Sequence, residues 1–219
     1  MAQIREVIAR AEERASQPSG TVRLVAVSKF HPAAAVAEAI AAGQTLFGES
    51  RVQEAVPKFA ALNAQLHLIG SLQRNKVKTA LGAVSCIQSV DRLALALEIE
   101  KQACALGKSV EILFEYHTGE ASKSGFVSEA ALFECLEAVS AMQFVIPKGF
   151  MTIAPFTDDA ARIRTSFRTL CRVASTAQQR FPSLPLRELS MGMSNDYEIA
   201  IEEGATLVRI GTAIFGERA

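Results

Sequence analysis

Short apolar runs alternate along the chain with longer amphipathic stretches. The run VRLVAVSKF at 22–30 has the length and β-branched content of a buried strand, and an alanine-rich helical stretch begins after Pro32. The same alternation then repeats to the end of the chain. The predicted strands lie at 22–30, 45–48, 66–70, 84–87, 109–116, 144–153, 187–191 and 206–210.

The stretches between these runs have helical periodicity, which is clearest at 91–105, 128–141 and 157–180. Asp91 and Thr157 are expected to cap the first and third of these helices. Residues 1–14 form a further amphipathic helix, because charged residues interrupt the apolar positions every few residues.

Strands that alternate with helices predict parallel β/α units. From Thr21 onward, eight units would have about 25 residues each, which suffices for a compact barrel. No linker or composition shift divides the chain. We therefore expect a single α/β domain over 1–219, a (β/α)₈ TIM-type barrel with an additional N-terminal helix. A doubly wound open sheet is the structural alternative.

Composition narrows the classes of partner. The 23 Lys and Arg residues balance 23 Asp and Glu residues, so the net charge is 0 and a nucleic-acid or anionic-membrane binder is not expected. No apolar run approaches the roughly 18 residues of a membrane span, and the N-terminus lacks the apolar core of a signal peptide. The cytoplasm is the expected compartment.

The four cysteines have no metal-binding or redox spacing. Neither a CxxC pair nor another metal motif is apparent, so buried, reduced thiols are expected and no metal site is predicted. On helical patterns, Cys104 and Cys135 are interpreted as packing residues. The remaining two are Cys86 and Cys171.

Lys29 is the first candidate for chemistry. It directly follows LVAVS, and catalytic groups of a barrel lie at the carboxyl ends of its strands. A lysine desolvated there favours the neutral amine, which attacks aldehydes to form a Schiff base. The alternative is a lysine whose ammonium group simply reaches solvent at the rim.

Two glycine-containing segments end the chain: SMGMSND at 190–196 and RIGTAIFG at 209–216. Small residues there expose backbone N–H groups, and each loop is expected to lead into a short helix whose positive end faces the barrel mouth. Barrels commonly bind phosphate at this place. Taken singly, Gly192, Gly211 and Gly216 are better explained as turn glycines. Together with Lys29, these segments indicate a ligand with an aldehyde at one end and a phosphate at the other.

Arg209 lies inside the last predicted strand, between apolar neighbours. A buried guanidinium needs an acceptor, and a structural ion pair is one explanation. A pyridine nitrogen is another, since a lysine Schiff base with an Asp or Arg at that nitrogen is the usual equipment for pyridoxal phosphate. An arginine keeps its proton, so it would leave the ring nitrogen unprotonated and transamination disfavoured.

Seven segments, in order, carry a resemblance over nearly the whole chain. The sequence resembles the pyridoxal phosphate homeostasis proteins, the YggS/PROSC family. The matching segments are LVAVSKFHP at 24–32, FGESRVQE at 47–54, HLIGSLQRNKVK at 67–78, SVDRLALA at 89–96, GEASKSGF at 119–126, GFMTIAP at 149–155 and LSMGMSNDYEIAIEEGATLVRIGTAIFG at 189–216.

The resemblance implies a barrel similar to the N-terminal domain of bacterial alanine racemases, with pyridoxal 5'-phosphate (PLP) held as a Schiff base on Lys29 and Arg209 facing the ring nitrogen. It implies a PLP carrier or regulator of vitamin B6 homeostasis without established catalytic turnover. Its partners would be PLP, related B6 vitamers and PLP-dependent apo-enzymes as recipients, and the chain would be a monomer or weak dimer. The implied phosphate-binding residues are Ser190, Met191, Ser194, Gly211 and Thr212.

Two segments depart from the family pattern, and either departure could alter PLP affinity. Ser50 stands in FGES where most relatives have asparagine, and Tyr116 with His117 stands where an asparagine at the strand end is more usual.

Two enzymes remain as alternatives. A PLP-dependent amino-acid racemase or isomerase needs a second base, and the chain's two tyrosines are Tyr116, which could approach the mouth, and Tyr197, which is interpreted as packing. A Schiff-base phosphosugar aldolase needs an acid/base group near its lysine. Glu49 is the main candidate, although it could instead orient a neighbouring lysine or loop.

The three histidines are weak candidates for catalysis, because none has an evident geometric partner. His67 is expected at the bottom of the barrel as a hydrogen-bonded structural residue, and His31 as a loop residue near the mouth. His117 has no stronger case.

Overall fold

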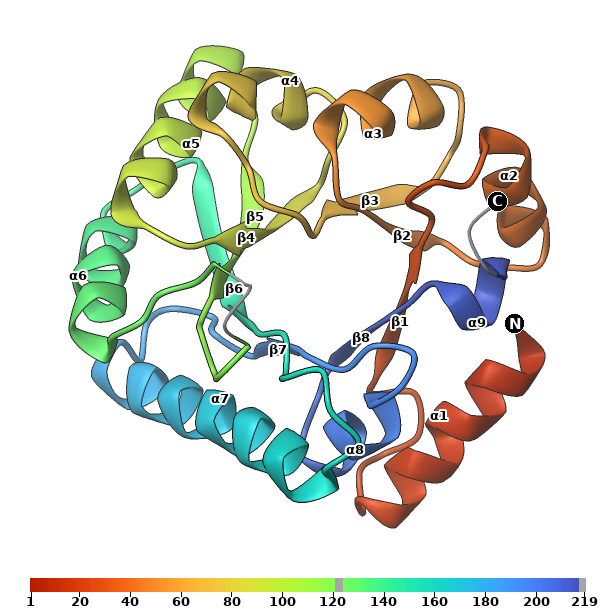
Figure 1. The fold of residues 1–219 in the computed structure, drawn as a ribbon. Helices are drawn as coiled ribbons and strands as arrows, with labels where there is room; N and C mark the ends of the chain where they lie inside the picture. The colour runs from red at the N-terminus through yellow and green to blue at the C-terminus, as the bar shows by residue number, and fades with distance from the viewer. Residues whose placement is uncertain (121–123, 217–219) are drawn as a thin grey trace.

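The computed structural model describes residues 1–120 and 124–216. Eight parallel strands, paired in chain order, close into a barrel with helices outside it (Figure 1). The (β/α)₈ prediction is therefore confirmed, and the open sheet is excluded. All eight predicted strands are present, within a few residues of their expected ends.

Helices and strands alternate regularly along the described chain. Their bounds are α1 Ala2–Arg14, β1 Arg23–Val27, α2 Ala33–Ala41, β2 Leu46–Glu49, α3 Val52–Phe59, β3 Gln65–Leu68, the 3₁₀ helix η1 Arg74–Lys76, α4 Val77–Leu81, β4 Cys86–Val90, α5 Leu93–Leu106, β5 Val110–Glu115, α6 Glu129–Ser140, β6 Val145–Met151, α7 Ala160–Arg180, β7 Glu188–Ser190, α8 Tyr197–Glu202, β8 Leu207–Ile210 and α9 Thr212–Phe215.

The strands are buried on both faces, which explains why they read as continuous apolar runs instead of alternating ones. One face packs against the helices and forms the larger core. The other fills the barrel with side chains from several strands. This inner cluster comprises Val25, Leu46, Cys86, Leu113, Met151 and Leu207.

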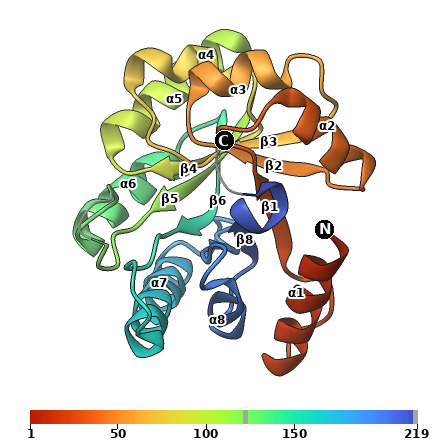
Figure 2. The ribbon, with the colours of Figure 1, turned by 45° about the vertical axis from the view of Figure 1, so that its right-hand side comes forward.

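The additional N-terminal helix is confirmed and completes the ring of helices. Ile4, Ile8 and Ala11 form the buried face of α1. The helix lies beside α8 in both ribbon views (Figures 1 and 2) and is joined to it by ion pairs from Arg14. At its other end, Arg5 donates to the Gly43 carbonyl after α2, at 2.7 Å. Since α9 has only four residues, α1 covers the ring between α8 and α2.

The helix caps differ from those expected. Arg92, not Asp91, stands at the N-cap of α5 and makes no side-chain cap bond. Asp159, not Thr157, caps α7 by accepting from the N–H groups of Ala161 and Arg162. In each case the helix begins later than the periodicity suggested, so the cap falls on a later residue.

The cysteines are all free thiols, as expected, but they are not all buried. Cys86 and Cys135 are buried, and Cys171 is partly exposed and donates to the Glu203 carbonyl. Cys104 is exposed on α5, so its assignment to packing is wrong. Within residues 1–120 and 124–216, no helix is long and apolar enough to cross a membrane.

Candidate functional site at the barrel mouth

Lys29 lies in a tight turn after β1, at the carboxyl end of the barrel, and is partly buried. The turn is held on both sides of it: the Phe30 N–H donates to Glu54 Oε1 at 2.6 Å and the His31 N–H donates to the Ser28 carbonyl at 3.0 Å. Phe30 has a φ of 69°, a conformation that non-glycine residues rarely adopt and that is kept where surrounding bonds over-determine it. The lysine is thus presented from a constrained turn.

A buried carboxylate and a second lysine support that turn from beneath. Glu49 ends β2 and is fully buried, and its Oε1 accepts from Ser28 Oγ at 2.7 Å and from Lys58 Nζ at 2.8 Å. Lys58 also donates to Glu54 Oε1 at 2.7 Å and to the Ser28 carbonyl at 2.8 Å. Glu49 therefore orients a neighbouring lysine and loop, as one interpretation of the sequence had it. Lys58 itself was missed, although its i+4 spacing from Glu54 was visible in the sequence.

The two carboxylate oxygens of Glu49 differ in their hydrogen bonding. Burial raises the pKa of its carboxyl, while the hydrogen bonds from Lys58 and Ser28 act in the opposite direction. Oε2 is buried and has no hydrogen-bond partner among the described residues. A buried polar atom without a partner is costly, so this oxygen is poised to accept from a donor that enters the mouth.

Arg209 lies in β8 with its side chain inside the barrel, and it is 4% exposed. Its NH1 donates to the carbonyl and hydroxyl oxygens of Ser190, at 2.8 and 2.7 Å, and its NH2 donates to the Thr152 carbonyl at 2.7 Å. No salt bridge to Arg209 is formed by the described carboxylates, although Asp196 and Glu115 lie near enough for their negative charges to raise its pKa. Burial lowers the pKa of the guanidinium to about 10, so it is still cationic at neutral pH.

A chain of hydrogen bonds leads from Arg209 down the barrel. Ser190 Oγ donates to Gln88 Oε1 at 2.7 Å, and the Gln88 side-chain nitrogen lies 2.8 Å from His67 Nδ1. Burial lowers the pKa of His67 to about 4, assisted by the charge of Arg23. The expectation of a buried, hydrogen-bonded histidine in the lower part of the barrel is confirmed. Gln88 was not singled out from the sequence, because nothing in its neighbours marks it.

Two of the residues implied as phosphate ligands have their donors engaged by the protein. Ser190 and Met191 are fully buried. Ser190 joins Arg209 to Gln88, and the Met191 N–H donates to the Leu207 carbonyl at 3.1 Å. These residues support the site from within the barrel.

The other implied phosphate ligands lie at neighbouring strand ends. Ser194 is partly buried after β7, and Gly211 and Thr212 follow β8. Because β8 pairs with β1, Gly211 lies beside the end of β1, where an added Cβ would come within 3.1 Å of the Val27 carbonyl. His31 stacks on Phe215 of α9, with ring centroids 5.2 Å apart, which joins the Lys29 turn to the Thr212 segment. The structure thus brings Lys29, Gly211 and Thr212 together.

The loop after β7 has a specific backbone shape. Gly192 has a φ of 91°, and a Cβ there would lie 2.5 Å from the Ala200 Cβ, so only glycine fits without a shift. Asp196 accepts from the Met193 N–H at 2.5 Å and closes the loop. The Gly192 carbonyl accepts from the Arg209 N–H at 2.9 Å, which ties this loop to β8.

Neither tyrosine reaches the mouth. Tyr116 is 8% exposed within the outer core, where it pairs with Phe126, and the nearby charges are Glu129 of α6 and Arg172 of α7. The suggestion that it approaches the mouth is therefore wrong. Tyr197 packs against the core from α8, as expected. His117 lies 3.1 Å from the Glu120 carbonyl and takes part in its own loop.

Comparison with known proteins places the chain in a family. The family model of the alanine racemase N-terminal domain matches residues 1–219. The pyridoxal phosphate homeostasis protein of Aquifex aeolicus is 39% identical over 221 residues, covering 100% of this chain and 96% of the relative. That of Escherichia coli K12 is 36% identical over 225 residues, covering 100% and 95%.

Solved structures agree in fold. PipY of Synechococcus elongatus, solved with PLP bound, has a TM-score of 0.85 and 41% identity, covering 96% of this chain and 100% of PipY. An alanine racemase of Clostridium difficile shares the fold with a TM-score of 0.75 at 12% identity, and the match covers 97% of this chain but 56% of the racemase. With full-length relatives well above 30% identity, this chain belongs to the family of pyridoxal phosphate homeostasis proteins.

Proposed function

We propose that this chain binds PLP covalently through the Lys29 amine, with the ring nitrogen at Arg209 and the phosphate at Ser194, Gly211 and Thr212, while Ser190 and Met191 support the pocket. In this proposal the protein is a carrier or regulator that takes up and releases PLP and related B6 vitamers. The relatives named above, and PipY with bound PLP, support it.

The bonding of Arg209 is the observation that carries the proposal. A guanidinium has five N–H donors, and the described acceptors are two oxygens of Ser190 and the Thr152 carbonyl. Two donors of a buried cation thus have no acceptor among the described residues. A buried charge needs partners, and a pyridine nitrogen at the barrel mouth would supply one.

The same arginine argues against transamination. Bound PLP supplies an electron sink, which is strongest when its ring nitrogen is protonated. Arg209 keeps its own proton at neutral pH, since its pKa of about 10 is still well above 7. It would donate a hydrogen bond to the ring nitrogen without transferring a proton, so the sink stays weak.

The arrangement of bases argues against racemisation. Racemisation needs a second base opposite the first, yet Tyr116 and Tyr197 pack away from the mouth. Glu49 and Lys58, next to the Lys29 turn, are hydrogen-bonded to each other. Neither tyrosine is therefore placed to act as the second base of a racemase.

The partial exposure of Lys29 is compatible with release of PLP. The side chain is partly exposed at the mouth, so an incoming amine from a vitamer pool or an apo-enzyme can approach it. We propose that the protein acts in the cytoplasm, as a monomer or weak dimer.

The test is an absorbance spectrum of the purified chain after addition of PLP, followed by borohydride reduction and peptide mapping. We expect visible absorbance from the bound cofactor and a reduced adduct on Lys29. Lys29→Ala should abolish the adduct and leave weaker, phosphate-anchored binding, while Lys78→Ala, at an exposed lysine on α4, should change neither.

Two outcomes would contradict the proposal. An adduct that persists in Lys29→Ala would mean that another lysine is used, such as Lys76 or Lys123, the latter outside the described residues. The absence of any visible band with added PLP would reject the carrier function and favour the phosphosugar aldolase.

A further inference from the structure

Three potential metal ligands meet at the end of the barrel opposite Lys29. The strand register pairs His67 of β3 with Cys86 of β4, and Cys86 with Glu111 of β5. Laterally paired residues of parallel strands project to the same face, and Cys86 belongs to the inner cluster, so all three face the interior. One ligand atom from each lies within 4.8 Å of the other two.

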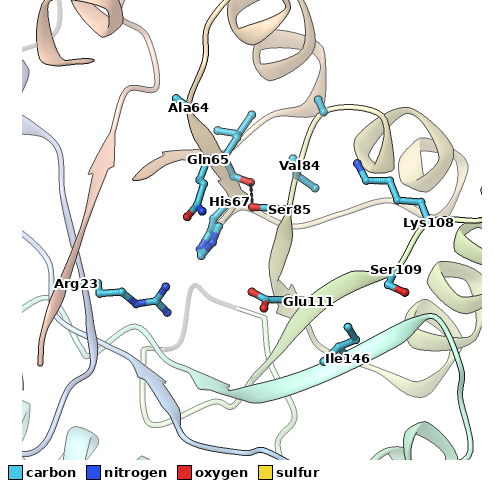
Figure 3. Close-up of a pocket in the computed structure, with 12 residues that line it drawn as sticks. Arg23, Ala64, Gln65, His67, Val84, Ser85, Lys108, Ser109, Glu111 and Ile146 are labelled. Atoms are coloured by element: carbon cyan, nitrogen blue, oxygen red, sulfur yellow. Dashed lines mark hydrogen bonds between the residues drawn. The ribbon is translucent and has the colours of Figure 1, made fainter. Parts of the chain in front are cut away.

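A cavity of about 510 Å³ opens onto this cluster from the amino-terminal side of the strands. His67 and Glu111 line it, and Figure 3 shows their side chains directed toward one another and toward Arg23. Cys86 is 2% exposed and adjoins both in the strand register. The cavity provides both an entry path and room for a non-protein ligand.

Gln88 orients the histidine from behind. Its side-chain amide lies 2.8 Å from His67 Nδ1, which leaves Nε2 as the ligand atom. Zinc binding through Nε2 requires the Gln88 amide to flip, so that its oxygen accepts from Nδ1–H and the Nε2 lone pair is left for the metal. Its nitrogen then donates to Ser190 Oγ, which at present donates to Gln88 Oε1.

We propose that His67, Cys86 and Glu111 form a binding site for Zn²⁺, with a fourth position open to the cavity. Nitrogen, sulfur and oxygen donors together favour zinc over magnesium or calcium, which select oxygen. Bonds of 2.0–2.3 Å place tetrahedral ligands about 3.3–3.7 Å apart. Side-chain rotations that bring the atoms about 1 Å closer would reach that geometry.

The charge of the site balances on binding. Zn²⁺ displaces the proton of the Cys86 thiol, which passes to solvent through the cavity, and a zinc–sulfur bond forms. One thiolate, one carboxylate and a neutral imidazole then compensate the two positive charges of the ion, so no net charge is buried.

Neighbouring positive side chains repel a bound Zn²⁺ ion, so removing one of them provides a control variant. Lys148 pairs with Glu111 at 3.5 Å, and Arg23 pairs with Glu188 at 2.7 Å while its guanidinium faces the cluster. Lys108 also lines the cavity. The side chains of Lys148 and Arg23 are partly exposed, so each can turn toward solvent. Arg23→Gln should therefore tighten zinc binding.

The experiment is equilibrium dialysis of chelator-treated full-length protein against buffered Zn²⁺, with metal content and X-ray absorption measured on the dialysed sample. We expect one zinc per chain, with one sulfur at about 2.3 Å and the remaining ligands at 2.0–2.2 Å. The result does not depend on PLP, because the site lies at the other end of the barrel.

Matched variants separate this site from adventitious binding. Cys86→Ser should remove the sulfur ligand, whereas Cys104→Ser, at the exposed thiol, should leave it. Glu111→Gln should weaken binding at least about tenfold. Its side chain is 40% exposed, so this variant should fold even if His67→Gln does not. No stoichiometric zinc at micromolar concentration, or a sulfur ligand retained in Cys86→Ser, would overturn the proposal.

Discussion

The two ends of the barrel carry polar side chains in different ways. At the mouth, Lys29 lies in a short loop with positive backbone φ at Phe30, and side chains of β2 and α3 hold this loop by hydrogen bonds. At the opposite end, His67, Cys86 and Glu111 are lateral neighbours on three paired strands. Loops allow a residue to be placed freely, whereas strands impose fixed neighbours. Local backbone conformation thus shapes the mouth, whereas strand pairing shapes the opposite end of the barrel, which we call the floor.

The two ends are nevertheless connected. Arg209, Ser190, Gln88 and His67 form one line of hydrogen bonds through an otherwise apolar interior. Amino-terminal ends of barrel strands usually contribute stability, and carboxyl-terminal ends contribute chemistry. Here a polar line joins them, so substitutions at either end test whether the division holds.

Lys58→Met should have the largest effect and should act at the mouth. Lys58 is 8% exposed and is the cation bonded to the fully buried Glu49, so its removal leaves a buried carboxylate without a counter-ion. We expect a loss of about 3–5 kcal/mol in the free energy of unfolding, measured by chemical denaturation. Adding Glu49→Gln should restore part of it, and additive losses in the double variant would contradict the ion-pair explanation.

The floor should respond to acid. His67 has a pKa of about 4 in the folded chain against an ordinary value of 6.5, so below pH 6.5 the unfolded chain takes up a proton that the folded chain does not. The free energy of unfolding of the metal-free protein should therefore fall by about 3 kcal/mol as the pH falls from 6.5 to 4. Denaturation at several pH values should show this slope, reduced in His67→Gln. An equal slope in both would mean that His67 is not the titrating group.

Arg209→Leu tests the hydrogen-bonded chain that connects the mouth of the barrel to its floor. It leaves the Thr152 carbonyl without the donor it has now, at an expected cost of about 1–3 kcal/mol. The absorbance of bound PLP should shift, because in the proposed arrangement the ring nitrogen would lose its hydrogen-bond donor. An unchanged spectrum in a folded variant would show that Arg209 does not contact the ring.

Ser50→Asn should have the smallest effect on stability. Ser50 is partly exposed, and its backbone passes close to Gly70, so a larger side chain must point away from the backbone contact. We expect a change within about 0.5 kcal/mol in unfolding. PLP affinity, measured by equilibrium titration, should change instead, and an identical affinity would remove Ser50 from the mouth.

Much of the barrel could be predicted because each strand is buried on both faces and therefore appears as an apolar run. Lys29 and Arg209 were also predictable, the first because it directly follows a run and the second because it interrupts one. The caps of α5 and α7 were not, since helical periodicity continues beyond the residues that form the helix. Tyr116 could be assigned to a strand end but not to a face of the barrel.

The sequence by itself determined the order of strands and helices, the lysine at the end of the first strand and the family to which the chain is similar. Only the tertiary structure decided that Lys58 supports Glu49, that Gln88 links Ser190 to His67, and that Cys86 meets Glu111. The physical reason is that closure and strand register set which side chains of distant segments become neighbours. That information belongs to the pairing between strands and to no single segment.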